Sequence, residues 1–259
     1  MLLAIDIGNT GITLGLFDGD RLGSHWRLAS DNERTSDEYG ILVTQLLERA
    51  GGGGGVRGVA IASVVPPLTG VVERACRDYL RADPLVVDAG TRTGIPLRYE
   101  DPKQVGADRV VNAVAVRRLY KGPVCVVDFG TATSFDALSA SGEYLGGAIA
   151  PGVGIAADAL FRRAAKLPRV ELLRPPSAIG RNTVHSLQSG LLYGYVGLVE
   201  GMVARFRAEL GPEMKTVATG ALAEQIAGET CAIDIVEPWL ALEGLKTLFE
   251  LNRPGARQS

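Results

Sequence analysis

Two segments of the chain place an aspartate, a glycine and small polar side chains directly after a short apolar run. In the first segment, Asp6, Gly8, Asn9 and Thr10 follow the run Leu2–Ile5. Glycine lets a turn bring backbone N–H groups against an anion without a Cβ in the way. The short Asn and Thr side chains add donors, so the pattern predicts a phosphate-binding turn. Because a bare carboxylate repels phosphate, Asp6 is better suited to a magnesium ion or to the water around it.

The same pattern recurs in the second half of the chain, over Asp128–Thr133. Both copies continue into an alternating strand, over residues 14–17 and 135–138, and then into a second hydrophilic turn, at 18–20 and 141–143. One such turn alone is as readily an ordinary β-hairpin. Two copies in matching context predict a duplicated strand-turn-strand-turn-strand unit.

Between the two copies, Asp108 and Arg109 precede a run of apolar residues at helical spacing. Both are expected in the first turn of that helix. A helix N-terminus favours anions, and a guanidinium pairs with phosphate or carboxylate. The pattern therefore predicts an anion site at the helix entrance, where Arg109 pairs with either a substrate carboxylate or the transferred phosphate. The alternative is a helix-terminal charge beside a solvated arginine.

Helices and strands alternate after the first opening hairpin. Apolar spacing predicts a helix over residues 36–49, with Thr35 or Ser36 as its N-cap. The elements expected next are a buried strand over 59–63, a helix over 68–80 and a strand over 85–87. The glycine run 51–55 is expected to be a flexible connection. The first half thus has the order βββαβαβ.

Composition excludes several classes of function. The formal charge of −2 and the absence of a basic run argue against a nucleic-acid partner. No apolar stretch is long enough to span a bilayer and no signal sequence is apparent, so we expect no membrane partner and a cytoplasmic location. The scattered cysteines, Cys76, Cys125 and Cys231, are expected to be buried thiols. With only His25 and His185, a histidine metal site and Ser-His catalysis are disfavoured.

A glycine stripe marks the helix expected over residues 186–210. Its members, at spacings of four, three and four, are Gly190, Gly194, Gly197 and Gly201. Each glycine costs a helix interior about 1 kcal/mol relative to alanine, so the stripe needs a packing reason. Two readings stay open, close packing inside the domain and a two-fold dimer contact.

The duplicated pattern resembles the paired RNase H-like domains of the actin, sugar-kinase and heat-shock-chaperone superfamily. This resemblance implies an α/β fold of two RNase H-like domains, each a βββαβαβ unit, with a cleft between them. The expected boundaries are 1–118 for the domain with the first phosphate turn and 119–259 for the domain with the second turn and the glycine-rich helix.

A more specific resemblance, to the type III pantothenate kinases, extends over nearly the whole chain. The motifs that carry it are Asp6-x-Gly8-Asn9-Thr10, Gly106–Arg109, Asp128–Thr133, Gly146–Gly152 and Gly180–Thr183. The resemblance implies ATP-dependent phosphorylation of pantothenate to 4'-phosphopantothenate, the first step of coenzyme A biosynthesis, with Asp108 as general base. It also implies a homodimer, which favours the dimer reading of the glycine stripe.

The resemblance implies a full set of site residues. ATP is assigned to Asp6, Ile7, Gly8, Asn9, Thr10, Gly11, Ile12, Thr13 and Thr131. Pantothenate is assigned to Tyr99, Gly106, Ala107, Asp108, Arg109 and Thr183, although a tyrosine such as Tyr99, taken alone, is more often a core aromatic. Magnesium accompanies ATP near Asp6, and a monovalent cation, potassium or ammonium, is assigned to Asp128. The other reading of Asp128 is a second magnesium carboxylate.

The chain departs from the family pattern at one motif, and two alternative functions remain to be considered. Where the family usually shows Thr-Gly-Gly, this chain has Thr219-Gly220-Ala221, which puts nucleotide affinity or base preference in doubt. The alternatives are a nucleotide-dependent regulatory or binding protein of the same superfamily and a kinase of another small hydroxylated metabolite. Fold alone does not separate them, because this architecture hosts all three.

Overall fold

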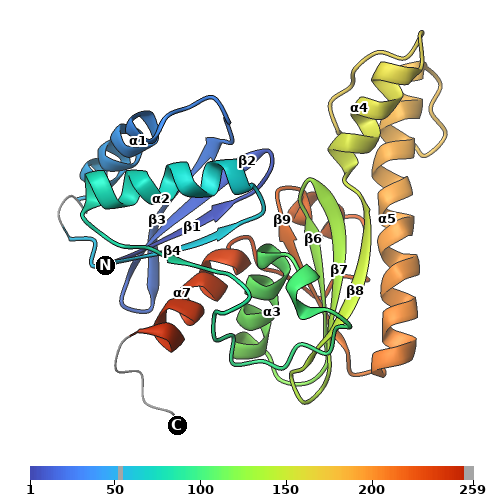
Figure 1. Ribbon diagram of the computed structural model, residues 1–259. Coiled ribbons are helices and arrows are strands. Elements are labelled where there is room, and N and C mark those ends of the chain that lie inside the picture. Colours follow the sequence, from blue (N-terminus) through green and yellow to red (C-terminus); the bar gives the residue numbers. More distant parts are fainter. Residues whose placement is uncertain (52–54, 254–259) are drawn as a thin grey trace. The chain divides into compact units, whose positions relative to one another are not determined.

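The computed structural model describes residues 1–51 and 55–253 (Figure 1). The centre of the predicted glycine connection, residues 52–54, lies outside the described residues. The chain divides into two compact units. Unit 1 comprises residues 1–118 together with the C-terminal helix α7 (Leu240–Asn252), and unit 2 comprises residues 119–239.

Unit 1 contains a five-stranded mixed sheet in the order β3-β2-β1-β4-β5. Its elements are β1 (Leu2–Ile7), β2 (Gly11–Asp18), β3 (Arg21–Ala29), α1 (Ser36–Arg49), β4 (Gly58–Ser63), α2 (Pro66–Leu80), β5 (Leu85–Val86), the short 3-10 helix η1 (Pro102–Gln104), α3 (Ala107–Leu119) and α7. Strand β1 runs antiparallel to β2 and parallel to β4. The predicted order βββαβαβ is confirmed.

Local signals in the sequence account for the helix boundaries of unit 1. Thr35 caps α1 in a reciprocal capping box with Glu38, which settles the choice between Thr35 and Ser36. Helix α2 begins at Pro66, two residues before the predicted start, because prolines suit the first helical positions. Helix α3 begins at Ala107, so Asp108 lies in its first turn as predicted.

The two faces of the unit 1 sheet are built differently. Helices α1 and α2 pack beside each other (Figure 1) and join Leu3, Ile5 and Ile7 of β1 in one apolar core. Helix α7 contacts β1, β2 and β4. A Cβ on Gly15 or Gly58 would lie 2.6 Å from Leu242 Cδ1 or 2.1 Å from the Phe249 ring, respectively. The small residues of the strands therefore let α7 approach closely.

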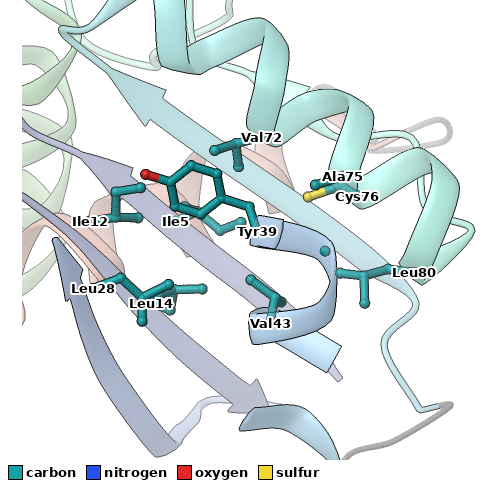
Figure 2. Close-up of a pocket in the computed structure, with 11 residues that line it drawn as sticks. Ile5, Ile12, Leu14, Leu28, Tyr39, Val43, Val72, Ala75, Cys76 and Leu80 are labelled. Atoms are coloured by element: carbon teal, nitrogen blue, oxygen red, sulfur yellow. The ribbon is translucent and has the colours of Figure 1, made fainter. Parts of the chain in front are cut away.

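A small void lies between α1, α2 and the first strands (Figure 2). It measures about 10 Å³, and apolar side chains such as Ile5, Leu14 and Val43 line it. The Tyr39 hydroxyl donates to the carbonyl of Asp31 at 3.1 Å and accepts from the Asp31 amide at 3.0 Å. A void of this size holds about one water molecule at most, so it is part of the core and not a ligand site.

Unit 2 repeats the topology of unit 1, with the strand order β10-β9-β6-β7-β8. Its elements are β6 (Val124–Phe129), β7 (Ala132–Leu138), β8 (Tyr144–Pro151), α4 (Val153–Arg163), α5 (Thr183–Leu210), β9 (Lys215–Gly220), α6 (Ala223–Ala227) and β10 (Ile235–Val236). Strand β6 runs antiparallel to β7 and parallel to β9, as β1 does to β2 and β4. The duplication predicted from the two Asp-x-Gly turns is therefore present in the strand topology. Between the third and fourth strands of the repeat, unit 2 has two helices, α4 and α5, where unit 1 has α1.

Helix α5 forms one wall of the unit 2 core. Leu192, Val196, Val199 and Val203 pack with the strands in one apolar cluster. The helix begins at Thr183, three residues before the predicted start, because Asn182 caps it by accepting from the His185 amide at 2.8 Å. In Figure 1 it is the long orange helix, which also contacts α4.

Two sequence expectations differ from the structure. The C-terminal helix α7 groups with unit 1, whereas the expected second domain was 119–259. Cys231 is exposed, so the prediction of three buried thiols is wrong for it, while Cys76 and Cys125 are buried. Apolar neighbours in sequence did not bury Cys231 because it lies in an irregular segment between α6 and β10.

None of the helices in the described part of the chain has the length and apolar character needed to cross a membrane.

Candidate active site

The first phosphate turn joins β1 to β2 in unit 1. Asp6 pairs with Thr13 across the strands, and the last pair before the loop is Ile7 with Ile12. The Gly8 amide donates to the Gly11 carbonyl at 3.0 Å, which closes the loop. Asn9 and Thr10, between these glycines, are exposed. The loop therefore presents its two polar side chains to solvent, as a phosphate-binding turn requires.

A serine directly after the end of β3 supports this turn. The Ser30 hydroxyl donates to the Gly8 carbonyl at 2.5 Å. On the other side, the Val64 amide donates to the Ile7 carbonyl at 3.1 Å. Both carbonyls that flank the start of the loop are thus held by hydrogen bonds from segments distant in sequence.

The second predicted site segment of unit 1 is the entrance of α3. Asp108 is half-buried, and its Oδ1 accepts from the Arg109 amide at 2.9 Å. A Cβ on Gly106 would lie 2.4 Å from Asp108 Oδ1. A side chain at position 106 would therefore force the Asp108 carboxylate to move from this position. Arg109 is 8% exposed, so the alternative of a solvated arginine is wrong.

Val64 connects these two segments of unit 1. Its amide binds Ile7 beside the first phosphate turn, and its Cγ1 lies 3.9 Å from the Cβ position of Gly106. The first phosphate turn and the helix entrance with Asp108 are therefore neighbours within the same unit. An acidic side chain that could accept a proton thus lies near a turn that could hold phosphate.

The second phosphate turn joins β6 to β7 in unit 2. Asp128 pairs with Ser134, and the last pair before the loop is Phe129 with Thr133. Gly130 is exposed at the tip and Thr131 is half-buried. The turn has the same place in its sheet as the first, at the carboxyl end of the strand that pairs with both neighbours.

Two further glycines hold the second turn by close contact. A Cβ on Gly152 would lie 2.2 Å from the Thr131 carbonyl oxygen, and the Gly152 amide donates to that oxygen at 3.2 Å. Gly220 has φ +91°, and its Cβ would lie 2.7 Å from Asp128 Oδ1. Both glycines belong to sequence motifs, but only their spatial neighbours show what each one does.

The departure from Thr-Gly-Gly falls on a tolerant position. Of the two glycines in the family pattern, this chain keeps Gly220, whose backbone conformation and close contacts favour glycine. The second is replaced by Ala221, which is exposed. The Ala221 methyl therefore does not disturb the contact between Gly220 and the second turn.

Thr183 lies at the start of α5. It is exposed, and the preceding Asn182 caps the helix. A Cβ on Gly180 would lie 2.4 Å from the Ser186 amide nitrogen, so the Gly180–Thr183 motif folds tightly against the first turn of α5. Tyr99 is half-buried in the irregular segment before η1.

The donor set of the first turn suits a nucleotide-bound magnesium ion. Among the described residues, no three His, Cys, Asp or Glu side chains gather where they could hold a metal. Magnesium commonly takes one or two protein carboxylates and fills its remaining positions with phosphate oxygens and water. The half-buried Asp6 fits that arrangement.

Comparison with known proteins identifies the family. The family model described as type III pantothenate kinase matches residues 2–205. The type III pantothenate kinase of Moorella thermoacetica is 56% identical over 97% of this chain and 100% of its own length. That of Geobacter sulfurreducens is 54% identical over 98% of this chain and all of its own. The chain belongs to the type III pantothenate kinase family.

Proteins of known structure that are more distantly related to this chain share its fold. A Campylobacter jejuni protein assigned to the Baf family of transcriptional activators matches with a TM-score of 0.60 at 18% identity, over 96% of this chain and 98% of that one. A Sinorhizobium meliloti protein assigned as a 2-dehydro-3-deoxygalactonokinase matches with a TM-score of 0.59 at 12% identity, over 100% and 99%. At such identities the likeness concerns the fold alone.

Proposed function

We propose that this type III pantothenate kinase transfers the γ-phosphoryl group of ATP to the 4'-hydroxyl of pantothenate, with Asp108 as the general base. The observation that carries the proposal is the placement of Asp108 beside the first phosphate turn, on either side of Val64. Family membership supplies the substrates, ATP and pantothenate.

Asp108 is suited to the role of base because phosphoryl transfer does not require a strong base. The transition state is loose, so the protein mainly positions the acceptor hydroxyl in line with the leaving group. Asp108 accepts a hydrogen bond from that hydroxyl and takes its proton late. The Arg109 amide, 2.9 Å from Asp108 Oδ1, fixes the carboxylate and leaves its second oxygen for the substrate.

The phosphate groups require donors and positive charge. The polar side chains of the two turns, including Asn9, Thr10, Thr13 and Thr131, supply donors to the β- and γ-phosphates. The magnesium ion that ATP carries would lie by Asp6 and neutralise charge on the leaving group. Arg109 pairs with the pantothenate carboxylate or with the transferred phosphate.

A substitution at Asp108 tests the base. We expect Asp108→Asn to bind nucleotide normally and to lower kcat about 10²-fold or more, as loss of a positioned base typically does. Asp101→Asn is the matched control, because Asp101 is exposed and caps η1 outside α3. Near-normal turnover of Asp108→Asn would overturn the assignment.

The acceptor is tested by ATP consumption with purified protein. We expect turnover with pantothenate and background rates with glucose, acetate and N-acetylhexosamines. Consumption that ignores pantothenate would favour a nucleotide-dependent regulatory protein, and preference for another acceptor would favour a kinase of that metabolite.

Asp128 is proposed to bind a monovalent cation. A carboxylate beside ATP phosphates raises the barrier by repulsion unless a cation lies between them. Potassium or ammonium, held by Asp128 and by neighbouring hydroxyl or carbonyl oxygens, would remove that repulsion. We expect several-fold activation when potassium replaces sodium at fixed ionic strength and saturating magnesium, and loss of the activation in Asp128→Asn. Equal rates in both salts would favour a magnesium or structural role.

Helix α5 is proposed to form a homodimer contact through its glycine stripe. Gly190, Gly194 and Gly197 are exposed, and a Cβ on any of them would meet nothing within 4 Å. The reading in which the stripe packs inside its own domain is therefore wrong for these three glycines, whereas a Cβ on the half-buried Gly201 would lie 3.3 Å from Arg205 of the same helix. The exposed Ala204 and Ala208 continue the same spacing, so the small-residue face runs along most of the helix.

The oligomeric state of two variants tests this contact. We expect Gly194→Leu to be monomeric by light scattering. Gly70→Leu is the matched control, since Gly70 is an exposed α2 glycine whose Cβ would also meet nothing within 4 Å. A dimer that survives substitution of both Gly194 and Gly197 would show that the interface lies elsewhere.

The cytoplasmic location of the protein stays a prediction.

A further inference from the structure

A charged side chain outside the assigned site lies beside the first phosphate turn. Arg27 belongs to β3, and its backbone pairs directly with Thr13 of β2. Thr13 in turn pairs with Asp6 of β1. Residues directly opposite each other on antiparallel strands point to the same face of the sheet. The three side chains therefore form one row, with the threonine between the carboxylate and the guanidinium.

The Arg27 side chain extends from this row to the turn itself. Its Nε lies 2.9 Å and its Nη2 3.4 Å from the Cβ position of Gly11, the last residue of the loop. Because Gly11 carries no side chain, the guanidinium lies directly against the backbone of the turn. A phosphate held at the loop would therefore meet this guanidinium.

The Arg27 guanidinium is available to a ligand. Arg27 is exposed, and its side chain takes part in no ion pair or hydrogen bond within the part of the chain that the structure describes. Other arginines of unit 1 are engaged: Arg77, for example, pairs with Asp83 at 2.7 Å. A guanidinium presents a planar fork of N–H donors that matches two oxygens of a phosphate. The position and chemistry of Arg27 therefore suit an anion at the turn.

Asp108 determines which phosphate would lie at this turn. The proposed base is a neighbour of the first turn through Val64, so the phosphoryl group that is transferred has to lie there. Val64 follows β4, whereas Arg27 lies on β3, and the sheet order is β3-β2-β1-β4-β5. Asp108 and Arg27 thus approach the turn from opposite sides, with space between them for the terminal phosphate.

We propose that Arg27 binds the γ-phosphate of ATP and stabilises its charge during transfer. The proposal rests on the kinase function proposed above and adds a catalytic residue to the same site. The γ-phosphorus forms a bond to the acceptor oxygen while its bond to the β–γ bridging oxygen breaks. Arg27 donates hydrogen bonds to the γ-phosphate oxygens and exchanges no proton. Charge spreads over these oxygens in the transition state, where a positioned guanidinium stabilises it.

Nucleotide binding without pantothenate tests the contact. We expect Arg27→Ala to weaken binding of the non-hydrolysable analogue AMP-PNP about tenfold or more, as loss of a charge-assisted hydrogen bond does. Binding of ADP, which has no γ-phosphate, should change less than about twofold. Calorimetry measures both. Arg21→Ala is the matched control, because Arg21 is exposed at the start of the same strand; it should change neither affinity. Unchanged AMP-PNP affinity in Arg27→Ala, or an equal loss for ADP, would overturn the proposal.

Turnover distinguishes the charge of Arg27 from a structural role. We expect Arg27→Ala to lower kcat about 10²-fold or more, as loss of one donor to the transition state does. Arg27→Lys should lose less, because it keeps the charge. Millimolar guanidinium chloride should restore part of the activity of Arg27→Ala, and urea, of similar shape but uncharged, should restore none. If both restore activity equally, or neither does, the proposal is overturned.

Failure of this proposal and failure of the proposed function give different results. The binding measurements omit the acceptor, so they hold for a kinase of another metabolite. If the protein phosphorylates pantothenate and Arg27→Ala keeps full affinity and turnover, the assignment of Arg27 is overturned and the proposed function stands. If pantothenate is not phosphorylated but AMP-PNP binding depends on Arg27, the assignment stands and the proposed acceptor is wrong.

Discussion

Two hydrogen bonds from segments distant in sequence hold the first phosphate turn, whereas the second turn combines one hydrogen bond, from the Gly152 amide to the Thr131 carbonyl, with close backbone contacts. Around the first, the Ser30 hydroxyl and the Val64 amide bind the carbonyls of Gly8 and Ile7. Around the second, Gly152 and Gly220 approach so closely that neither has room for a Cβ.

The loops also differ in length. Four residues, Gly8 to Gly11, separate the last paired residues Ile7 and Ile12 of the first turn. Three residues, Gly130 to Ala132, separate Phe129 and Thr133 of the second. One sequence pattern thus gives two turns that depend on different neighbours. Substitutions around the two turns should therefore destabilise them for different reasons.

The largest effect is expected at Gly220. A non-glycine residue in the left-handed region costs about 1–2 kcal/mol, and overpacking against Asp128 and Phe129 adds about 1–3 kcal/mol. We expect Gly220→Ala to lower the free energy of unfolding in urea by about 3 kcal/mol. The exposed neighbour provides the control Ala221→Gly, which should change it by less than about 1 kcal/mol. A stable Gly220→Ala would show that the second turn does not depend on this contact.

A second pair of substitutions distinguishes Gly152, which packs against the second turn, from Gly130, which lies at the tip of that turn. A Cβ on Gly152 would lie 2.2 Å from the Thr131 oxygen, but one on Gly130 would lie at an ordinary 3.6 Å from the Ala132 oxygen. We expect Gly152→Ala to destabilise unit 2 by about 2 kcal/mol and Gly130→Ala by less than about 1 kcal/mol. Thermal unfolding followed by circular dichroism measures both. Equal losses would mean that the two glycines share one role.

The hydrogen-bonded turn should yield a smaller effect. Loss of the Ser30 hydroxyl removes one hydrogen bond to Gly8, worth about 1 kcal/mol. We expect Ser30→Ala to cost that much stability and to raise the KM for ATP several-fold, with kcat little changed, because the loop loses its anchor. Ser24→Ala, on the same strand hairpin, is the control. An unchanged KM would show that the loop is held without Ser30.

The buried thiols provide the mildest test. Burial raises the pKa of Cys76 in unit 1 and of Cys125 in unit 2 to about 12, whereas Cys231 is exposed. We expect Ellman's reagent to modify one thiol per native chain at pH 8, and none in Cys231→Ser. Raising the pH to 9 should leave Cys76 and Cys125 unreactive, because burial raises the pKa of both thiols and keeps them protonated at that pH.

The same thiols report where a substitution acts. In a Cys231→Ser background, Gly220→Ala should increase the labelling of Cys125, three residues before Asp128, and leave Cys76 protected. Equal exposure of both thiols would show that the defect spreads through the whole chain.

Local patterns in the sequence were sufficient for the turns, for the helix start before Asp108 and for the duplication. Each depends on residues close together in the chain: a glycine after a strand, an acid in a first helical turn, a capping threonine. The family resemblance also followed from such motifs, and the comparisons confirmed it.

Contacts between distant segments were decided by the tertiary structure alone. Spacing does not encode that α7 packs on the first sheet, that Arg109 is buried, or that three glycines of α5 face open space. Gly152 and Gly220 look like any other glycines in the sequence. They are required because strands and loops far apart in the chain meet at the second turn, and the space left for a Cβ depends on that meeting and not on either local sequence.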